Sequence, residues 1–96
     1  MPRPVKCRRV CDFPGIQDFG PLPSQEREDR IYMTVDEYET IRLMDREGLS
    51  QEQCAERMEV ARTTVQKVYE SARQKLALML TEGRPLHIEG GQYRLC

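Results

Sequence analysis

Tryptophan is absent from this 96-residue sequence, histidine occurs once, and aromatic residues make up only 6% of the chain. No apolar run approaches the roughly 20 residues that a membrane-spanning helix requires, because Arg73, Gln74 and Lys75 interrupt the most apolar region. Residues 1–11 are basic, but no apolar stretch follows them as it would in a signal peptide. We therefore expect a cytoplasmic protein without membrane contacts.

Patterns typical of catalysis are also lacking. The sequence has no recognisable nucleophile–base pair and no phosphate-binding loop, so an enzyme is the function class that we expect least. The single histidine, His87, is interpreted as a structural or surface residue of a short strand. Several acids of one predicted helix are interpreted as its solvated face: Asp36, Glu37, Glu39, Asp45 and Glu47.

The net charge is only −1, but the charge is unevenly distributed. Residues 1–11 carry a charge of +4, residues 12–60 carry −8, residues 61–80 carry +3, and residues 81–96 are neutral. Positive charge is thus concentrated in two segments. Both are candidates for contact with a phosphate backbone, while the acidic middle is expected to face away from it.

Residues 49–80 carry the clearest pattern in the sequence. Ser50 and Gln53 form a capping box, which predicts a short helix over about 51–58. The apolar face of this helix consists of Cys54, Ala55 and Met58. After an interruption at residues 59–60, a second helical pattern continues to about residue 81. Its apolar stripe contains Val65, Val68, Tyr69, Ala72, Leu76, Met79 and Leu80.

A short helix, a tight turn and a longer helix predict a DNA-binding helix-turn-helix. Ala55 provides a small contact between the helices, and Val60 is predicted to lie buried under the turn. The second helix has an outward side of hydrogen-bond donors expected to enter the major groove: Arg62, Thr63, Thr64, Gln66 and Lys67. The alternative is an ordinary helical hairpin with a solvated polar face.

Basic residues outside this motif are predicted to hold the DNA backbone. Arg73 lies further along the second helix, and the N-terminal segment contributes Arg3, Lys6, Arg8 and Arg9. The N-terminal group is interpreted either as an arm that grips phosphate or enters the minor groove, or as a solvated basic tail.

The remaining pattern predicts a single, mainly α DNA-binding domain over residues 1–96. Residues 1–33 are expected to form an irregular, Pro-rich arm, with short extended segments at Ile31–Met33 and near Val10. Residues 34–81 form the three-helix core, in which the helix-turn-helix occupies 50–81. Within residues 84–96 we expect a β-hairpin that turns at Gly90–Gly91.

The first core helix is predicted over residues 35–47. Thr34 and Glu37 form its capping box, and Gly48 is placed to end it. The surplus of apolar residues at 76–80 suggests either a homodimer contact, which is common among helix-turn-helix proteins, or packing against the C-terminal tail.

The four cysteines allow several interpretations. Cys54 is expected in the core, and reduced thiols are the expectation for the others, since disulfides are rare in the cytoplasm. A metal ion or iron–sulfur cluster bound by Cys7, Cys11 and Cys96 is one alternative, and a redox sensor that uses Cys7 and Cys11 is another.

Five stretches resemble the uncharacterised protein family 0251, also called domain of unknown function 134. They are MPRPVKCRRVC, FGP, TVDEYETIRLMDREGLSQEQCAERM, VARTTVQKVYESARQKLA and LHIEGGQYRL. The resemblance implies a fold similar to region 4 of sigma factors and the winged-helix-like superfamily, and a transcriptional regulator that binds double-stranded DNA. It also implies that such turns carry Gly at the position of Glu59 and a Ser or Thr cap at that of Ala61. Loss of the cap should weaken the helix start by about 1 kcal/mol.

A protein-interaction module with the same fold is the main competing function. Such a module would dock on RNA polymerase or another partner without reading DNA. A metal or redox sensor is compatible with DNA binding, because the cysteines would then control the DNA-bound state.

Overall fold

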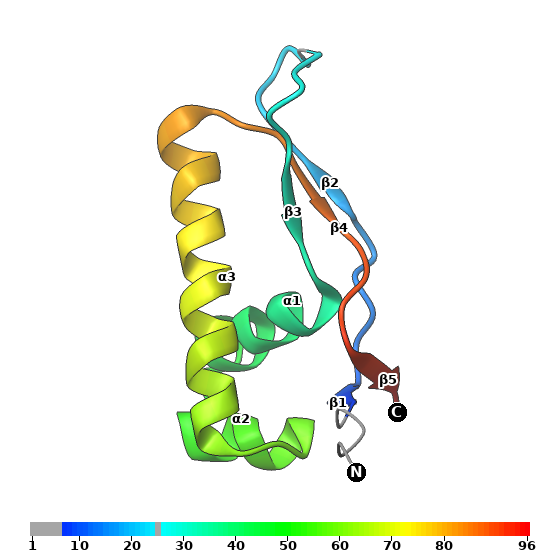
Figure 1. Cartoon of the computed structure of the whole chain (residues 1–96), viewed down its shortest axis with the longest axis vertical. Helices are drawn as coiled ribbons and strands as arrows, with labels where there is room; N and C mark the ends of the chain where they lie inside the picture. Colours follow the sequence, from blue (N-terminus) through cyan, green and yellow to red (C-terminus); the bar gives the residue numbers. More distant parts are fainter. Residues whose placement is uncertain (1–6, 25) are drawn as a thin grey trace, which may run out of the picture.

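The computed structural model describes residues 7–24 and 26–96 (Figure 1). The elements in chain order are β1 (Arg8–Val10), β2 (Asp18–Phe19), β3 (Ile31–Met33), α1 (Val35–Ile41), η1 (Arg42–Arg46), α2 (Gln51–Met58), α3 (Arg62–Glu82), β4 (Leu86–Ile88) and β5 (Tyr93–Leu95). The helices form most of the regular structure, as predicted. None of the described helices is long and apolar enough to cross a membrane.

Helices α1 and α2 begin at the predicted capping residues. The Thr34 side chain accepts from the backbone N–H of Glu37, and Ser50 does the same for Gln53, so both capping boxes are formed. The predicted helix over 35–47 is present, but its last part, η1, has the wider π-helical winding. Gly48 follows it with φ +77°, a conformation that glycine adopts without strain.

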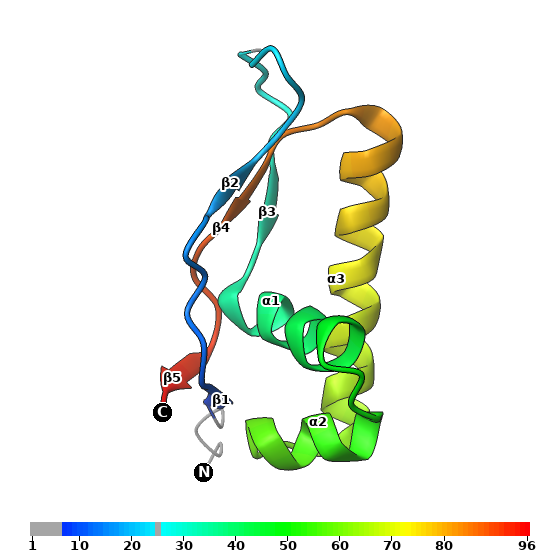
Figure 2. The same cartoon turned by 180° about the vertical axis from the view of Figure 1, so that it is seen from behind.

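The strands form two small sheets that join the two ends of the chain. β1 pairs in parallel with β5, while β4 lies between an antiparallel β2 and a parallel β3. Figures 1 and 2 show these strands on one side of α1 and the long α3 on the other. Residues far apart in the sequence therefore lie side by side near α1.

The predicted C-terminal hairpin is wrong, although both of its strands exist. β4 and β5 pair with N-terminal strands rather than with each other. The Gly90–Gly91 link instead crosses the start of α1, where the backbone N–H of Val35 donates to the Gly90 carbonyl at 3.0 Å. An isolated two-stranded hairpin is marginal in water, whereas each strand here pairs with a strand that also contacts the core.

The N-terminal segment is mostly irregular, as predicted, but it contains one more strand than expected. The predicted extended segments at Ile31–Met33 and near Val10 are strands β3 and β1, and β2 is an additional strand between them. Val10, Ile31 and Met33 are buried. The segment is therefore part of the folded body, because its short strands complete sheets that the C-terminal strands cannot form alone.

Among the described residues, two apolar clusters make up the core. One lies between the strands, α1 and the middle of α3, and its buried residues are Val10, Ile31, Met33, Val35, Ala72, Leu86 and Ile88. The other holds α2 against α3 and consists of Leu43, Cys54, Ala55, Met58 and Val65. Leu80, predicted on the apolar stripe of α3, is 77% exposed and lies outside both clusters.

Candidate nucleic-acid interface

The turn between α2 and α3 fixes the angle at which the two helices meet. Glu59 ends α2 in the left-handed conformation, with φ 57°, which is uncommon for a residue other than Gly. The backbone N–H of Val60 donates to the carbonyl of Ala55 at 3.0 Å, and Val60 packs against the α2–α3 cluster. Ala55 is buried at the small-contact position as predicted, whereas Val60, predicted to be buried under the turn, is half-buried there.

Cys54 contributes to this packing rather than to chemistry. It is fully buried, and burial raises the pKa of its thiol to about 11. A thiol with so high a pKa is protonated at neutral pH and is a poor ligand or nucleophile.

Four of the five residues predicted to contact bases or phosphate face solvent from the start of α3. Arg62, Thr63, Gln66 and Lys67 are exposed, whereas Thr64 is half-buried. Within the described residues, the side chains of Thr63 and Lys67 make no hydrogen bond or ion pair. Arg62 donates to Gln51 at 3.2 Å, and Gln66 lies 3.5 Å from Glu70. The four side chains therefore form one accessible donor surface.

Arg73 is held in a defined position two turns beyond this surface. Its guanidinium donates to the Tyr69 hydroxyl at 2.9 Å and lies 5.4 Å from the centre of that ring. The Tyr69 hydroxyl donates in turn to Asp45 at 2.7 Å, and this bond raises the pKa of Tyr69. Arg73 remains exposed, so it keeps free donors for an anion.

The predicted N-terminal arm divides into three parts. Arg3 and Lys6 lie outside the described residues. The Arg8 guanidinium is turned inward, with Nε 3.4 Å from Asp36 and a further bond to Gln92. Arg8 therefore holds β1 to α1 and does not extend outward as an arm would. Arg9 is more exposed and lies near Glu59, with 3.7 Å between its Nε and the carboxylate.

The acids at the start of α1 are not a solvated face, which corrects the sequence interpretation. Asp36, Glu37 and Glu39 are 5%, 5% and 1% exposed. Each pairs with a different part of the structure: Asp36 with Arg8 on β1, Glu37 with Ser71 and Lys75 on α3, and Glu39 with Arg42 on η1. Only Asp45 and Glu47 are exposed as expected.

Glu37 and Glu39 are well satisfied by these contacts. Burial tends to raise the pKa of Glu37, but bonds from Lys75, Ser71 and the Thr34 backbone outweigh it and lower this pKa below its usual value. Glu39 accepts from Arg42 at 2.6 Å and from the backbone N–H of Cys11 at 2.9 Å, and its bond raises the pKa of Arg42. The negative charges of Glu37 and Glu39 are therefore balanced by cations inside the molecule.

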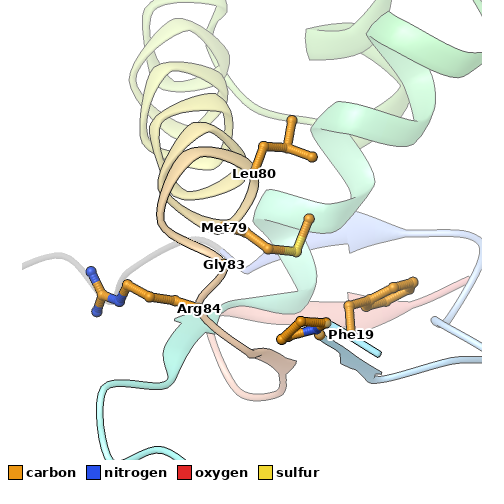
Figure 3. Close-up of a pocket in the computed structure, with 7 residues that line it drawn as sticks. Phe19, Met79, Leu80, Gly83 and Arg84 are labelled. Atoms are coloured by element: carbon orange, nitrogen blue, oxygen red, sulfur yellow. The ribbon is translucent and has the colours of Figure 1, made fainter. Parts of the chain in front are cut away.

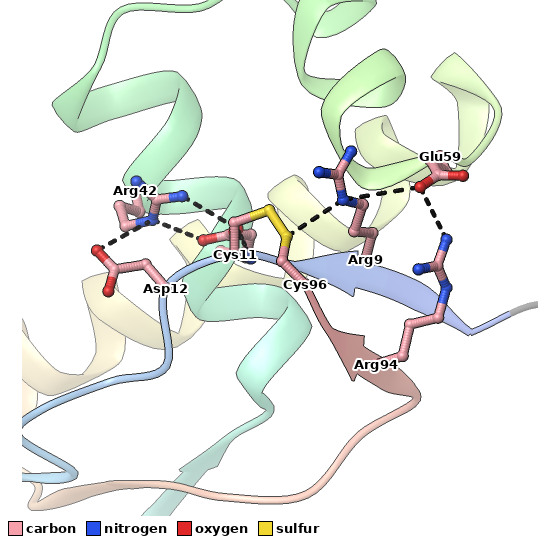
Figure 4. Close-up of a disulfide and its surroundings, with 8 residues drawn as sticks. Arg9, Cys11, Asp12, Arg42, Glu59, Arg94 and Cys96 are labelled. Atoms are coloured by element: carbon pink, nitrogen blue, oxygen red, sulfur yellow. Dashed lines mark hydrogen bonds and ion pairs between the residues drawn. A yellow bond between two sulfur atoms is a disulfide. The ribbon is translucent and has the colours of Figure 1, made fainter.

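The cysteines differ from expectation, since Cys11 and Cys96 form a disulfide (Figure 4). The bond follows from the pairing of β1 with β5, which brings the two Cα atoms to 4.9 Å. Cys7 is exposed and free. Among the residues that the structure describes, no three His, Cys, Asp or Glu side chains form a metal-binding group, so Cys7, Cys11 and Cys96 do not assemble as a metal site.

His87 lies on β4, as expected for a strand residue. Its Nδ1 is 2.7 Å from Asp18 and its Nε2 is 3.3 Å from Glu89. The bond to Asp18, followed by that to Glu89, raises the pKa of His87. The ring thus links β2 to β4 when protonated.

Comparison with known proteins assigns the chain to a family. A family model described as "Protein of unknown function DUF134" matches residues 1–96. The chain belongs to this family. A UPF0251 protein of Desulfitobacterium hafniense (strain Y51) is 58% identical over all of this chain and 78% of its own length. A UPF0251 protein of Caldicellulosiruptor saccharolyticus is 46% identical over 97% of this chain and 66% of its own length. One of Clostridium botulinum is 48% identical over all of this chain and 63% of its own length. No solved structure matches.

The names of these relatives state no activity, so a function can be proposed only from the arrangement of side chains in this structure. Sequence reasoning missed one feature near the α2–α3 turn: Arg94 on β5 donates to Glu59 at 2.8 Å. No local pattern indicated this contact, because residues 81–96 are neutral overall and were interpreted as a hairpin.

An apolar groove lies at the C-terminal end of α3. Its volume is about 340 Å³, and its lining consists of Phe19, Gly20, Pro21, Met79, Leu80, Gly83 and Arg84 (Figure 3). The Arg84 guanidinium is turned toward the Asp29 carboxylate at 3.6 Å. The groove therefore presents mainly carbon atoms.

Proposed function

We propose that this chain binds double-stranded DNA in a sequence-specific manner, with the start of α3 in the major groove. The proposal is carried by the exposed donor surface of Arg62, Thr63, Gln66 and Lys67 on one side of a helix. α2 supports that helix through the packed turn at Val60. Side chains of this kind pair with base edges, and a helix fits the width of the groove.

The distribution of charge supports this proposal despite the net charge of −1. The three buried acids of α1 are each paired with a cation, so their field is largely cancelled within the molecule. The exposed side of α3 carries Arg62, Lys67 and Arg73, with Glu70 as the acid among them. Cations that remain accessible to solvent are the ones that displace counterions from DNA.

The test is selection of bound sequences from a random duplex library at about physiological salt. An enriched motif is the expected result. Arg62→Ala should then weaken binding to that motif by about 1–3 kcal/mol and relax the preference at one base step. Arg30→Ala is the matched control, because this exposed arginine directly precedes β3, and β3 begins at the opposite end of the molecule from the start of α3 (Figure 1).

Two results would contradict the proposal. If the folded protein enriches no sequence, DNA reading fails and docking on a protein such as RNA polymerase becomes the better hypothesis. If Arg62→Ala weakens binding to all sequences equally, the residue does not read bases, because a phosphate contact carries no sequence information.

We further propose that the chain acts as a homodimer through the distal end of α3. Leu80 is 77% exposed beside the apolar groove, and a second copy would cover both. Sedimentation equilibrium should give a dimer, and Leu80→Gln should shift it toward monomer without unfolding it. A monomer at concentrations where DNA is bound would refute the dimer but leave DNA reading intact.

A further inference from the structure

We infer that the parallel β1–β5 ribbon forms a second DNA contact, in which Arg9 and Arg94 bind the phosphate backbone beside the α2–α3 turn. This inference rests on the proposed function. The register of the ribbon places Arg9 opposite Arg94, so the two residues are neighbours on adjacent strands. Both guanidinium groups approach the same Glu59 carboxylate, at 3.7 Å and 2.8 Å.

The position of Glu59 determines where this pair of arginines lies. Glu59 ends α2, and α3 begins at Arg62, so the pair lies next to the start of the proposed recognition helix. Figure 4 shows Arg9 and Arg94 converging on Glu59 from the two strands. Because a duplex is wider than a helix, its backbone would extend from the groove that holds α3 over this neighbouring surface.

The charges and exposure of the three groups suit phosphate. The side chains of Arg9, Arg94 and Glu59 are 39%, 48% and 42% exposed, so none is buried in a structural pair. Two guanidinium groups share one carboxylate, which leaves positive charge at the surface. Guanidinium binds carboxylate and phosphate oxygens with the same geometry, so a phosphate can take the place of Glu59 as acceptor.

A third arginine lies along the same side. A polar hollow of about 400 Å³ between β1 and α2 is lined by Arg9 and Arg57, together with Leu49, Gln53 and Glu56. Arg57 is exposed on α2. Arg57 therefore places one further cation near Arg9, beside the exposed acid Glu56.

The competing explanation is that the arginines only fix the turn through Glu59. The two explanations predict opposite effects of Glu59→Gln. If the arginines bind phosphate, removal of the carboxylate releases them and deletes a negative charge, so affinity should rise. If they only hold the turn, removal of the carboxylate loosens the turn, so affinity should fall.

The experiment measures the dissociation constant for one duplex over a series of salt concentrations. Arg94→Gln should reduce the slope of log affinity against log salt by about 0.9, the value for one lost phosphate contact. It should weaken binding to specific and random duplexes alike, and Arg94→Lys should restore most of the slope. In the double variant Glu59→Gln/Arg94→Gln, the slope should stay below that of Glu59→Gln alone. Arg30→Gln is the control for loss of an exposed arginine.

The outcomes separate this inference from the proposed function. If the unaltered protein binds no duplex, both fail. If it binds, but Arg94→Gln leaves the slope unchanged or Glu59→Gln lowers the affinity, only the ribbon contact is refuted. Circular dichroism of each variant shows whether it is folded, and the double variant tests the contact independently of the Arg94–Glu59 bond.

Discussion

Loss of the Lys75 charge should destabilise the fold more than loss of any exposed lysine. Lys75 on α3 lies 2.6 Å from Glu37 on α1, whose side chain is only 7% exposed. Lys75→Met leaves that carboxylate buried without its cation, and removing one partner of a buried pair typically costs about 3–5 kcal/mol. Because Lys75 itself is 29% exposed, and because Ser71 still donates to Glu37, we expect a loss of about 2–3 kcal/mol.

The assay is urea unfolding at neutral pH, with Lys67→Met as the matched control. Lys67 is an exposed lysine of the same helix, so its loss should change the unfolding free energy by less than about 0.5 kcal/mol. A double-mutant cycle with Glu37→Gln isolates the pair, and the double variant should lose less than the sum of the single ones. Equal effects of Lys75→Met and Lys67→Met would refute the conclusion that Glu37 is a buried, paired acid.

The same pair gives a pH dependence with a defined sign. The pKa of Glu37 is lowered in the folded state, so its stabilising contribution is present above the ordinary value of 4.5. It is lost as the pH falls through the lower folded-state pKa. The stability difference between the unaltered protein and Glu37→Gln should therefore be largest at neutral pH and shrink in acid. A difference that stays constant down to acid unfolding would contradict this assignment.

Three further predictions concern the chain ends and the turn. In the oxidised protein, Cys11→Ser should lower the unfolding free energy by up to about 4–5 kcal/mol, because the Cys11–Cys96 bond closes a loop of 85 residues. Cys7→Ser is the control and should leave the unfolding free energy unchanged. Equal unfolding free energies for the two variants would contradict the disulfide. Gly91→Ala should lower the melting temperature, because φ is +99° and an added Cβ would meet an acid of α1. Ala61→Ser should stabilise α3 by about 1 kcal/mol, measured by urea unfolding, because the cap now lacks a side-chain bond; no gain would mean that the start of α3 is already satisfied.

The helices could be predicted from the sequence because their signals are local. Thr34 with Glu37 and Ser50 with Gln53 are each three residues apart, and both capping boxes are formed. The end of α2 was found although Glu59 replaces the usual Gly, because the apolar spacing changes on either side of it. The exposed side of α3 followed from the same periodicity, with Thr64 as the residue that is partly buried.

The sheets could not be predicted because their partners are far apart in the sequence. β1 pairs with β5 across most of the chain, and β4 pairs with β2 and β3. Strands of two or three residues carry almost no alternation of apolar and polar positions. The Gly90–Gly91 pair is a strong local hairpin signal, but here the positive φ of both residues lets the chain cross α1.

The buried acids show a second limit of reasoning from periodicity. Asp36, Glu37 and Glu39 occupy positions that a charge pattern assigns to solvent. Their burial depends on Arg8, Lys75 and Arg42, which come from β1, α3 and η1. Such pairs are invisible until the fold brings the elements together, so the charge pattern along one helix cannot reveal them.

The arrangement of the chain ends also bears on the proposed function. β1 and β5 are joined by backbone pairing and by the Cys11–Cys96 bond, and this pairing keeps Arg9 opposite Arg94. The arginine pair is therefore ordered before any DNA is present. A surface that is already ordered loses less conformational entropy on binding, so more of its contact energy appears as affinity. If the chain binds DNA as proposed, reduction of the Cys11–Cys96 bond should therefore weaken that binding.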